Sequence, residues 1–355
     1  MIEESEIDEW LNNDDMNALI EGDSREVLRS FPAESIDCVV TSPPYWGVRE
    51  YSGDSQLGNE ETVEEYIDNL AEIINELKRV LKPEGSFWLN IGDTYQNKDL
   101  VGVPWRTALA LKKRQDWILR NDVIWNKVKG NPSSATDRLR VMHEYIFHFV
   151  KKQKYYYDMD SIREDPDFEV EIRENGDVVS PTGVSGTRYR KQIKENDTLN
   201  KKEKENALEE LERHLEMLKN KEIKDFRMVI RDEQRSTHGN SEELSGRARE
   251  LAENGFYFLR YNAEGAAPGN IWDIVPEDQH RDDTHCAVYP AEICEIPIRA
   301  TCPPDGVVLD PFVGTGTTVV AANRLKRKAI GIDASSDYLK TAKSRLADGV
   351  QTKLR

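Results

Sequence analysis

The chain has little cysteine and no long apolar run, and both absences exclude whole classes of protein. Only four cysteines occur in 355 residues, and no two of them have the CxxC spacing typical of zinc sites and redox pairs. The four are Cys38, Cys286, Cys294 and Cys302. Cys294 and Cys302 fall in an apolar stretch, which indicates packing rather than disulfide bonding, and we expect no bound metal.

Sequences typical of membrane insertion or secretion are also lacking. No segment approaches the roughly 18 consecutive apolar residues that a membrane-spanning helix needs. The acidic start MIEESEIDEW has neither the basic nor the apolar part of a signal peptide. We therefore expect a cytoplasmic protein without membrane contact.

Net positive charge is lacking as well, but the acidic excess is confined to one part of the chain. The formal net charge is −17, and residues 1–100 alone, with 7 Lys+Arg against 24 Asp+Glu, account for −17. Residues 101–157 hold 12 basic and 4 acidic side chains, so this segment is locally positive. Contact with phosphates needs a local basic surface, so the net charge does not exclude nucleic acid.

Strand-like and helix-like segments alternate over most of the chain. The predicted strands include Asn17–Ile20, Ser35–Thr41, Ser86–Ile91, Ile118–Lys127 and Val141–Val150, followed late in the chain by Val307–Asp310 and Ala329–Ile332. Helices are predicted over Arg25–Phe31, Thr62–Leu81, Trp105–Lys113, Ala291–Ala300 and Thr317–Leu325. This alternation predicts an α/β fold with a doubly wound, mostly parallel sheet.

The alternation is interrupted at residues 159–268, which are polar and irregular. A charged helix is predicted from about Thr198 to Phe226. One stripe of this helix is apolar and consists of Leu208, Leu211, Leu215 and Leu218. The stripe indicates a face that packs within the protein, with a partner-binding coiled coil as the alternative.

Residues 307–333 read as one βαβ nucleotide-binding unit. A strand ends at Asp310, a loop with Gly314 and Gly316 follows, and a second strand ends at Asp333, 23 residues after Asp310. The third glycine of a dinucleotide fingerprint and a Walker lysine are both missing. An acid at the end of the first strand would repel a pyrophosphate, but it suits a cofactor that carries an ammonium and a sulfonium. The unit therefore favours S-adenosyl-L-methionine over NAD or ATP.

The loop Ser42-Pro43-Pro44-Tyr45 follows a buried strand, and open α/β sheets bind their ligands at that end of a strand. The lone pair of a base's exocyclic amino group is conjugated into the ring, so the nitrogen is a poor nucleophile. A proline-fixed loop can hold the amino hydrogens with backbone carbonyls, aided by the Ser42 hydroxyl. Tyr45 can stack on a base flipped out of the duplex. These residues predict direct methyl transfer to an amino nitrogen, without a covalent intermediate.

Together the two motifs resemble the permuted β-class amino-group DNA methyltransferases, in which the catalytic loop comes first and the cofactor loop last. The resemblance covers roughly 1–158 and 271–355. It implies a Rossmann-like methyltransferase fold with a catalytic half (1–158), an inserted target-recognition region (159–268) and a cofactor half (269–355). It implies that Asp333 holds the cofactor's ribose, that Asp23 lies near its adenine, and that the stretch from His285 to Glu292, with Tyr289 and Pro290, covers its methionine part. The predicted cofactor-binding residues are Asp23, Thr41, Pro290, Asp310, Pro311, Phe312, Gly314, Gly316, Thr317 and Asp333.

The identity of the target base depends mainly on one side chain. In the family that this chain resembles, serine at the first loop position usually accompanies cytosine-N4 methylation, and aspartate accompanies adenine-N6 methylation. Ser42 therefore favours cytosine N4, with adenine N6 as the alternative. Methylation of cytosine C5 needs a cysteine after a proline in the catalytic loop, and this loop has none. An RNA or protein-glutamine methyltransferase and a non-catalytic DNA-binding regulator are further alternatives.

Double-stranded DNA is the expected partner. Candidate DNA contacts are Trp46, Lys127, Lys129, Arg138 and Arg140. In the middle region, the basic candidates are Arg188, Arg190, Lys191, Arg227, Arg231 and Arg235. The chain shows no convincing nuclease motif, so we expect any cognate restriction endonuclease to be a separate chain.

Overall fold

The computed structural model describes residues 1–47, 57–129, 135–164, 169–173, 178–180, 183, 185–233, 246–276 and 289–351. The chain divides into two compact units. Unit 1 comprises Met1–Ser161 and Gly269–Arg355, and unit 2 comprises Ile162–Pro268. Cys286, Arg235 and the predicted methionine-covering residues before Tyr289 lie outside the described residues. In the described part of the chain, no helix is long and apolar enough to cross a membrane.

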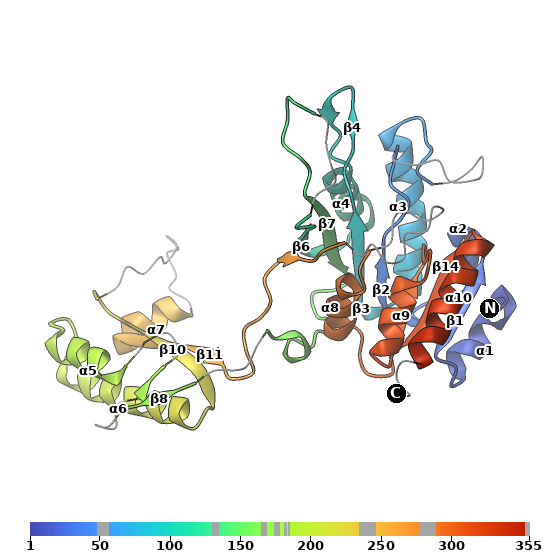
Figure 1. Ribbon diagram of the computed structural model, residues 1–355. Helices are drawn as coiled ribbons and strands as arrows, with labels where there is room; N and C mark the ends of the chain where they lie inside the picture. The colour runs from blue at the N-terminus through green and yellow to red at the C-terminus, as the bar shows by residue number, and fades with distance from the viewer. Residues whose placement is uncertain are drawn as a thin grey trace. The chain divides into compact units, whose positions relative to one another are not determined.

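Unit 1 is built on an eight-stranded sheet with the strand order β1-β14-β13-β2-β3-β7-β6-β12 (Figure 1). In that order the strands are β1 (Asn17–Glu21), β14 (Lys328–Asp333), β13 (Val307–Asp310), β2 (Ile36–Thr41), β3 (Leu81–Ile91), β7 (His143–Val150), β6 (Ile118–Asn126) and β12 (Ile271–Asp273). Among these strands, only β7 runs antiparallel to its neighbours, β3 and β6. The predicted mostly parallel α/β sheet is therefore confirmed.

Helices cover both faces of this sheet. One face packs against α1 (Ile7–Asn12), α2 (Ser24–Arg29), α3 (Val63–Val80) and α4 (Val103–Gln115). The other face packs against α8 (Glu292–Thr301), α9 (Thr317–Arg324) and α10 (Ser336–Gln351). A short 3-10 turn (Glu4–Glu6) precedes α1, and the small strands β4 (Tyr95–Gln96) and β5 (Asp99–Leu100) form a hairpin. The fold is thus doubly wound.

The strands of the sheet alternate their side chains between the two cores, which explains their continuous apolar runs. In β2, Val39 belongs to the first core, whereas Cys38 and Val40 belong to the second. Cys294 and Cys302 are buried free thiols, as their apolar stretch predicted, and Cys38 is buried and free as well. The acidic N-terminal segment is docked as well, because Ile7 and Trp10 of α1 are buried in the first core.

Unit 2 has a hydrophobic core of its own, so the expectation of an irregular middle region is wrong. Its elements are a 3-10 turn (Asp160–Ile162) that begins in unit 1, β8 (Glu171–Ile172), β9 (Val178–Val179), α5 (Gly186–Glu195), α6 (Lys201–Lys219), β10 (Ile223–Ile230), α7 (Arg247–Asn254) and β11 (Phe256–Asn262). The helix predicted to reach Phe226 ends at Lys219, and Phe226 lies in β10, which pairs with β11. Leu211, Leu215 and Leu218 are buried in this core, so the stripe packs within the unit.

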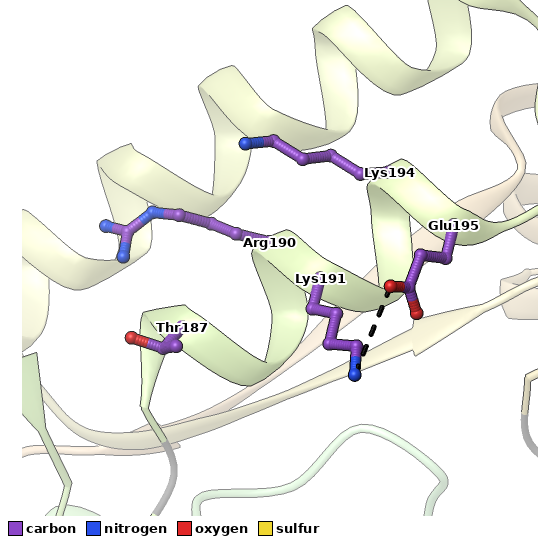
Figure 2. A pocket seen from close by; sticks show the side chains of 5 residues that line it. All are labelled: Thr187, Arg190, Lys191, Lys194 and Glu195. Carbon is purple, nitrogen blue, oxygen red and sulfur yellow. Dashed lines mark ion pairs between the residues drawn. The ribbon is translucent and has the colours of Figure 1, made fainter.

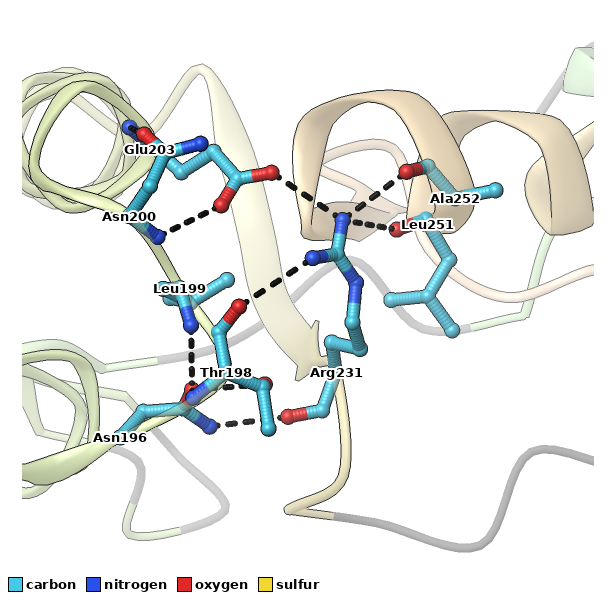
Figure 3. A network of polar contacts seen from close by, with 8 residues as sticks. All are labelled: Asn196, Thr198, Leu199, Asn200, Glu203, Arg231, Leu251 and Ala252. Carbon is cyan, nitrogen blue, oxygen red and sulfur yellow. Dashed lines mark hydrogen bonds and ion pairs between the residues drawn. The ribbon is translucent and has the colours of Figure 1, made fainter.

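Arg231, a candidate nucleic-acid contact, joins three elements of unit 2 (Figure 3). Its Nη2 donates to Oε1 of Glu203 at 3.1 Å and to the carbonyls of Leu251 and Ala252 at 3.2 and 2.9 Å, while Nη1 donates to the Thr198 carbonyl at 3.3 Å. The two carbonyls belong to the last turn of α7, where a cation also opposes the helix dipole. The side chain therefore stabilises the unit from within.

Replacing Arg231 with alanine is expected to destabilise unit 2 by about 2 kcal/mol, because the carbonyls of α7 and Glu203 lose a charged donor. Hydrogen exchange of the amides in α7 and β11 measures this loss. Arg227→Ala is the matched control, since Arg227 is exposed on β10 and its removal should cost less than about 0.5 kcal/mol. Equal effects of the two substitutions would contradict the assignment.

Candidate active site

The two sequence motifs meet where the parallel strands β2 and β13 end side by side. Leu309 is in register with Val39, so Asp310 and the end of β2 reach the same edge of the sheet. Oγ1 of Thr41 donates a 2.6 Å hydrogen bond to Oδ1 of Asp310 across 269 residues of sequence. The catalytic loop begins at the next residue, Ser42, so this bond joins the two predicted halves of the site directly.

Asp310 is buried at 1% exposure and is held by four donors. Oδ1 also accepts from the Phe312 amide at 3.0 Å, and Oδ2 accepts from Oγ1 of Thr318 at 2.6 Å and from the Tyr289 hydroxyl at 3.1 Å. Burial raises the pKa of this carboxyl to about 6, although the hydrogen bonds lower it. A nearby cation would favour the ionised form of such a group.

The glycine loop after Asp310 is held by the second acid, Asp333. The Gly314 amide donates to Oδ2 of Asp333 at 2.8 Å, and the Ser335 amide donates to Oδ1 at 2.9 Å. Gly316 has φ +87° and precedes α9, and a Cβ there would lie 2.7 Å from Cβ of Ala342. Only glycine combines this backbone conformation with so close an approach. Thr317 begins α9 and accepts a hydrogen bond from Arg345 at 3.1 Å.

Most other predicted cofactor residues lie around these two strand ends. The Ser24 hydroxyl donates to the Pro311 carbonyl, and the Gly22 amide donates to the Asp333 carbonyl at 3.0 Å, so the turn after β1 adjoins the glycine loop. Asp23, within that turn, is exposed and caps α2 by accepting from the Arg25 amide at 2.8 Å. Pro290 is buried just before α8, next to Tyr289. The cofactor contacts of these residues stay predictions.

The catalytic loop is fixed from two sides. Pro43 is buried, and the hydroxyl of Tyr66 in α3 donates to the Pro44 carbonyl at 2.9 Å. The ring of Tyr45 lies against Gly92, where a Cβ would come within 2.7 Å of Cε2 of Tyr45. Gly92 directly follows β3, and it leaves room for the tyrosine ring because it has no side chain. The loop is thus held against the neighbouring strand end, and its catalytic role stays a prediction.

Two site residues escaped the sequence prediction. Asn90 in β3 donates from Nδ2 to the Tyr45 hydroxyl oxygen at 2.9 Å, and Glu144 in β7 accepts from that hydroxyl at 2.8 Å. Burial, followed by the charge of Glu144, raises the pKa of the Tyr45 hydroxyl. The only available signal was the placement of Asn90 near the end of a predicted strand. The antiparallel pairing of β7 with β3, which brings Glu144 to the same edge, could not be read from periodicity.

Two of the predicted DNA contacts, Trp46 and Lys127, form contacts within the protein. Trp46 is 6% exposed in the first core, and its Nε1 donates to the Glu60 carbonyl at 3.0 Å, so it packs inside the protein. Lys127 forms an ion pair with Glu144 at 2.5 Å. Lys129, Arg138 and Arg140 are exposed, and the Arg138 guanidinium lies 3.8 Å from the centre of the Tyr95 ring. These three stay candidate DNA contacts.

In unit 2, basic side chains project from α5 (Figure 2). Thr187, Arg190, Lys191, Lys194 and Glu195 line a shallow pocket there. Arg190 is held by Glu212, with Nε 2.7 Å from Oε1, and Lys191 lies 4.0 Å from Glu195. Arg188 and Lys191 are exposed. The helix α5 therefore presents positive charge to the solvent.

Known proteins resemble this chain over most of its length. The N6/N4 methyltransferase family, described as DNA methylase, matches residues 36–344. The chain belongs to this family. The methyltransferase is 30% identical over 360 residues to the type II methyltransferase M.SmaI of Serratia marcescens, covering 92% of this chain and 90% of that one. It is 31% identical over 380 residues to the type II methyltransferase M.SfiI of Streptomyces fimbriatus, covering 91% and 89%. It is thus a site-specific DNA methyltransferase of the N6/N4 class.

Two solved structures share the fold of the methyltransferase. The cytosine-N4-specific PvuII DNA methyltransferase superposes with a TM-score of 0.57 at 20% identity, covering 93% of this chain and 86% of that one. The DNA modification methylase TTHA0409 of Thermus thermophilus, solved with S-adenosyl-L-methionine, gives a TM-score of 0.50 at 24% identity, covering 94% and 96%. The predicted methyltransferase fold is therefore confirmed.

Proposed function

We propose that this methyltransferase modifies the exocyclic N4 of cytosine in a short duplex sequence. The observation that carries the proposal is the hydrogen bond from Thr41 to Asp310, because it places Ser42 directly beside the cofactor loop. Ser42 provides a neutral hydroxyl at the position where adenine-specific relatives usually carry an aspartate. The solved PvuII enzyme, which shares the fold, is named for the same reaction.

The cofactor is S-adenosyl-L-methionine, which supplies an electrophilic methyl group when bound. The residues present fit it. Each carboxylate oxygen of Asp333 accepts one backbone amide, so lone pairs remain for two ribose hydroxyls. Gly314 and Gly316, both at positive φ, let the loop backbone approach a ligand closely. The buried carboxylate of Asp310 favours a cationic ligand beside it.

The chain's own residues then orient the target amino group. Tyr45, fixed by Gly92 and by hydrogen bonds, offers a ring face on which a flipped base can stack. The Ser42 hydroxyl and the loop carbonyls accept hydrogen bonds from the amino hydrogens as the nitrogen becomes tetrahedral. Acceptors fixed in advance stabilise the charge that develops on the nitrogen without further reorganisation.

Recognition of the DNA sequence is proposed for unit 2. Its separate core makes it a compact module, and the exposed Arg188 and Lys191 of α5 provide positive charge for phosphate contact. Any cognate restriction endonuclease is proposed to be a separate chain, because this sequence carries no convincing nuclease motif.

The test of the proposed reaction is the modified base itself. DNA from a host that expresses the methyltransferase is expected to contain N4-methylcytosine in one short motif, measured by nucleoside mass spectrometry and methylation-sensitive long-read sequencing. The Ser42→Ala variant, expressed at the same level, should leave that motif unmodified or nearly so. N6-methyladenine in the motif would overturn the cytosine assignment and leave the family assignment intact.

A further inference from the structure

A partly buried polar cluster lies behind the catalytic loop and joins three strand ends. Oγ of Ser42 lies 3.1 Å from the Tyr45 hydroxyl, which lies 2.8 Å from Oε2 of Glu144. Nδ2 of Asn90 lies 2.9 Å from the Tyr45 oxygen, 3.0 Å from Oε2 of Glu144 and 3.3 Å from Oγ of Ser42. Lys127 lies 2.5 Å from Oε1 of Glu144, the oxygen that faces away from Tyr45. The proposed methyl transfer assigns no role to Glu144, Asn90 or Lys127.

The direction of the hydrogen bonds in this cluster is fixed by chemistry. An ionised carboxylate only accepts hydrogen bonds, and the nitrogen of an amide only donates them. Glu144 must therefore accept from the Tyr45 hydroxyl, and Asn90 must donate to the Tyr45 oxygen. Since the single proton of Tyr45 is directed to Glu144, Ser42 can only donate to Tyr45. The chain of donors thus runs from Ser42 through Tyr45 to Glu144.

This direction decides what Ser42 can offer to a substrate. A hydroxyl that has directed its proton to Tyr45 has only lone pairs left, and one of them faces Asn90 at the longer distance of 3.3 Å. The remaining lone pair can accept a hydrogen bond from an amino group, whereas a freely rotating hydroxyl could equally present its proton. An amino group of a base donates through its hydrogens, so only the accepting form of Ser42 suits the reaction.

We propose that Glu144 is a positioning residue that sets Ser42 as a hydrogen-bond acceptor for the target amino group, acting through Tyr45. The inference rests on the proposed function, since it assigns Ser42 a substrate contact. Lys127 completes the arrangement, because it occupies the outer oxygen of Glu144 and orients the carboxylate. At 23% and 13% side-chain exposure, Lys127 and Glu144 form this pair mostly away from solvent.

Glu144→Gln tests the proposal because it keeps the size of the side chain and changes the direction of the chain of donors. Lys127 can only donate, so the oxygen of the new amide is expected to face Lys127 and its nitrogen to face Tyr45. Tyr45 then accepts from residue 144 and is free to donate to Ser42, which loses its accepting orientation. The single-turnover rate of methyl transfer is expected to fall on the order of 10- to 100-fold, with unchanged affinity for the cofactor.

Two further variants distinguish a role of Glu144 in hydrogen-bond direction from a role in side-chain packing. Tyr45→Phe removes the link, so Glu144→Gln should have no additional effect in its background, and the double variant should be faster than Glu144→Gln alone. Glu144→Asp is smaller but still only accepts, so it should retain more activity than Glu144→Gln, whereas a packing role predicts the reverse. Glu64→Gln, in an exposed ion pair with Arg106, is the matched control and should react at the wild-type rate.

Two results would overturn the proposal. One is a double variant that is as slow as Glu144→Gln or slower, and the other is Glu144→Asp being slower than Glu144→Gln. Thermal unfolding and cofactor binding show whether Glu144→Gln folds. If it does not, the rate of Glu144→Asp is compared with that of the wild type instead. A single-turnover rate more than about 10-fold below the wild-type rate then counts against the proposal. Each assay identifies the methylated nucleoside by mass spectrometry. Methylated adenine would thus reject the cytosine assignment separately from the rate comparisons.

Discussion

Asp310→Asn is expected to weaken the affinity for S-adenosyl-L-methionine by about 100-fold, measured by titration calorimetry at pH 7.5. The carboxylate is buried, and its removal deletes a negative charge beside the proposed position of a cationic cofactor. For unit charges about 6 Å apart at an effective dielectric constant near 20, that attraction amounts to ~2.8 kcal/mol, on the order of 100-fold in affinity. The fold should persist because Thr318 and Tyr289 present hydroxyls that can turn to accept from the new amide.

The pH dependence of cofactor affinity provides an independent test of the role of the Asp310 carboxylate. Because the pKa of Asp310 is raised to about 6, the carboxyl is largely ionised at pH 7.5 and largely protonated at pH 5. In the wild type, the cofactor affinity should therefore fall as the pH is lowered through about 6, and in Asp310→Asn this step should be absent. Without cofactor the sign is opposite: a raised folded-state pKa means that the Asp310 contribution to stability is lost as the pH rises through about 6.

Asp305→Asn is the matched control for this substitution. Asp305 is exposed, lies five residues earlier and has φ +61°, a conformation that asparagine tolerates. Its cofactor affinity should equal that of the wild type. An Asp310→Asn protein that binds the cofactor normally would refute the assignment of Asp310 to the cofactor site.

Tyr45→Ala is expected to reduce the single-turnover rate of methyl transfer by about 100-fold or more, with cofactor affinity changed less than about threefold. Stacking of a base on an aromatic ring contributes about 1–3 kcal/mol, and the same substitution removes the link between Ser42 and Glu144. The cofactor loop keeps its own hydrogen bonds to Asp333, so it should be unaffected. Equal losses of rate and cofactor affinity would argue against a target-base role for Tyr45.

Rapid-quench assays with a duplex substrate and calorimetry with the cofactor alone measure the two quantities separately. Tyr45→Phe provides the graded comparison, since it retains the ring and loses only the hydroxyl. It should keep most of the stacking, and its rate should lie between those of the wild type and Tyr45→Ala. A Tyr45→Phe protein as slow as Tyr45→Ala would assign the whole effect to the hydroxyl.

The sequence predicted seven of the eight sheet strands and most helices of unit 1, because each of these buries a continuous or regularly spaced apolar face; β12 and α10 were not predicted. The α3 helix, for example, begins one residue after the predicted Thr62 and ends at Val80. The prediction failed in the middle region, where the helix was extended to Phe226. After the helix ends at Lys219, Ile223–Ile230 form the mostly buried strand β10. Its partner, β11, begins 26 residues after β10 ends, and such pairing leaves little local signal.

The sequence predicted the surroundings of the cofactor-loop residues better than those of the candidate DNA contacts. Asp310, Asp333 and the two glycines follow from the order of strand, loop and helix, which local sequence specifies. Lys127 was assigned to DNA because it lies in the locally basic segment 101–157, and Trp46 directly follows the catalytic loop. The structure places Trp46 in the hydrophobic core and Lys127 in an ion pair, and residue type does not distinguish these surroundings.

The sequence by itself determined the two motifs, their order along the chain and the kind of chemistry that each can carry out, because glycines, prolines and acids at strand ends act locally. Only the tertiary structure decided that Thr41 bonds to Asp310 and that Asn90 and Glu144 surround Tyr45. Those contacts depend on which strands are neighbours and in which direction they run. Strand order is set by burial across the whole sheet, so no single segment of the chain encodes it.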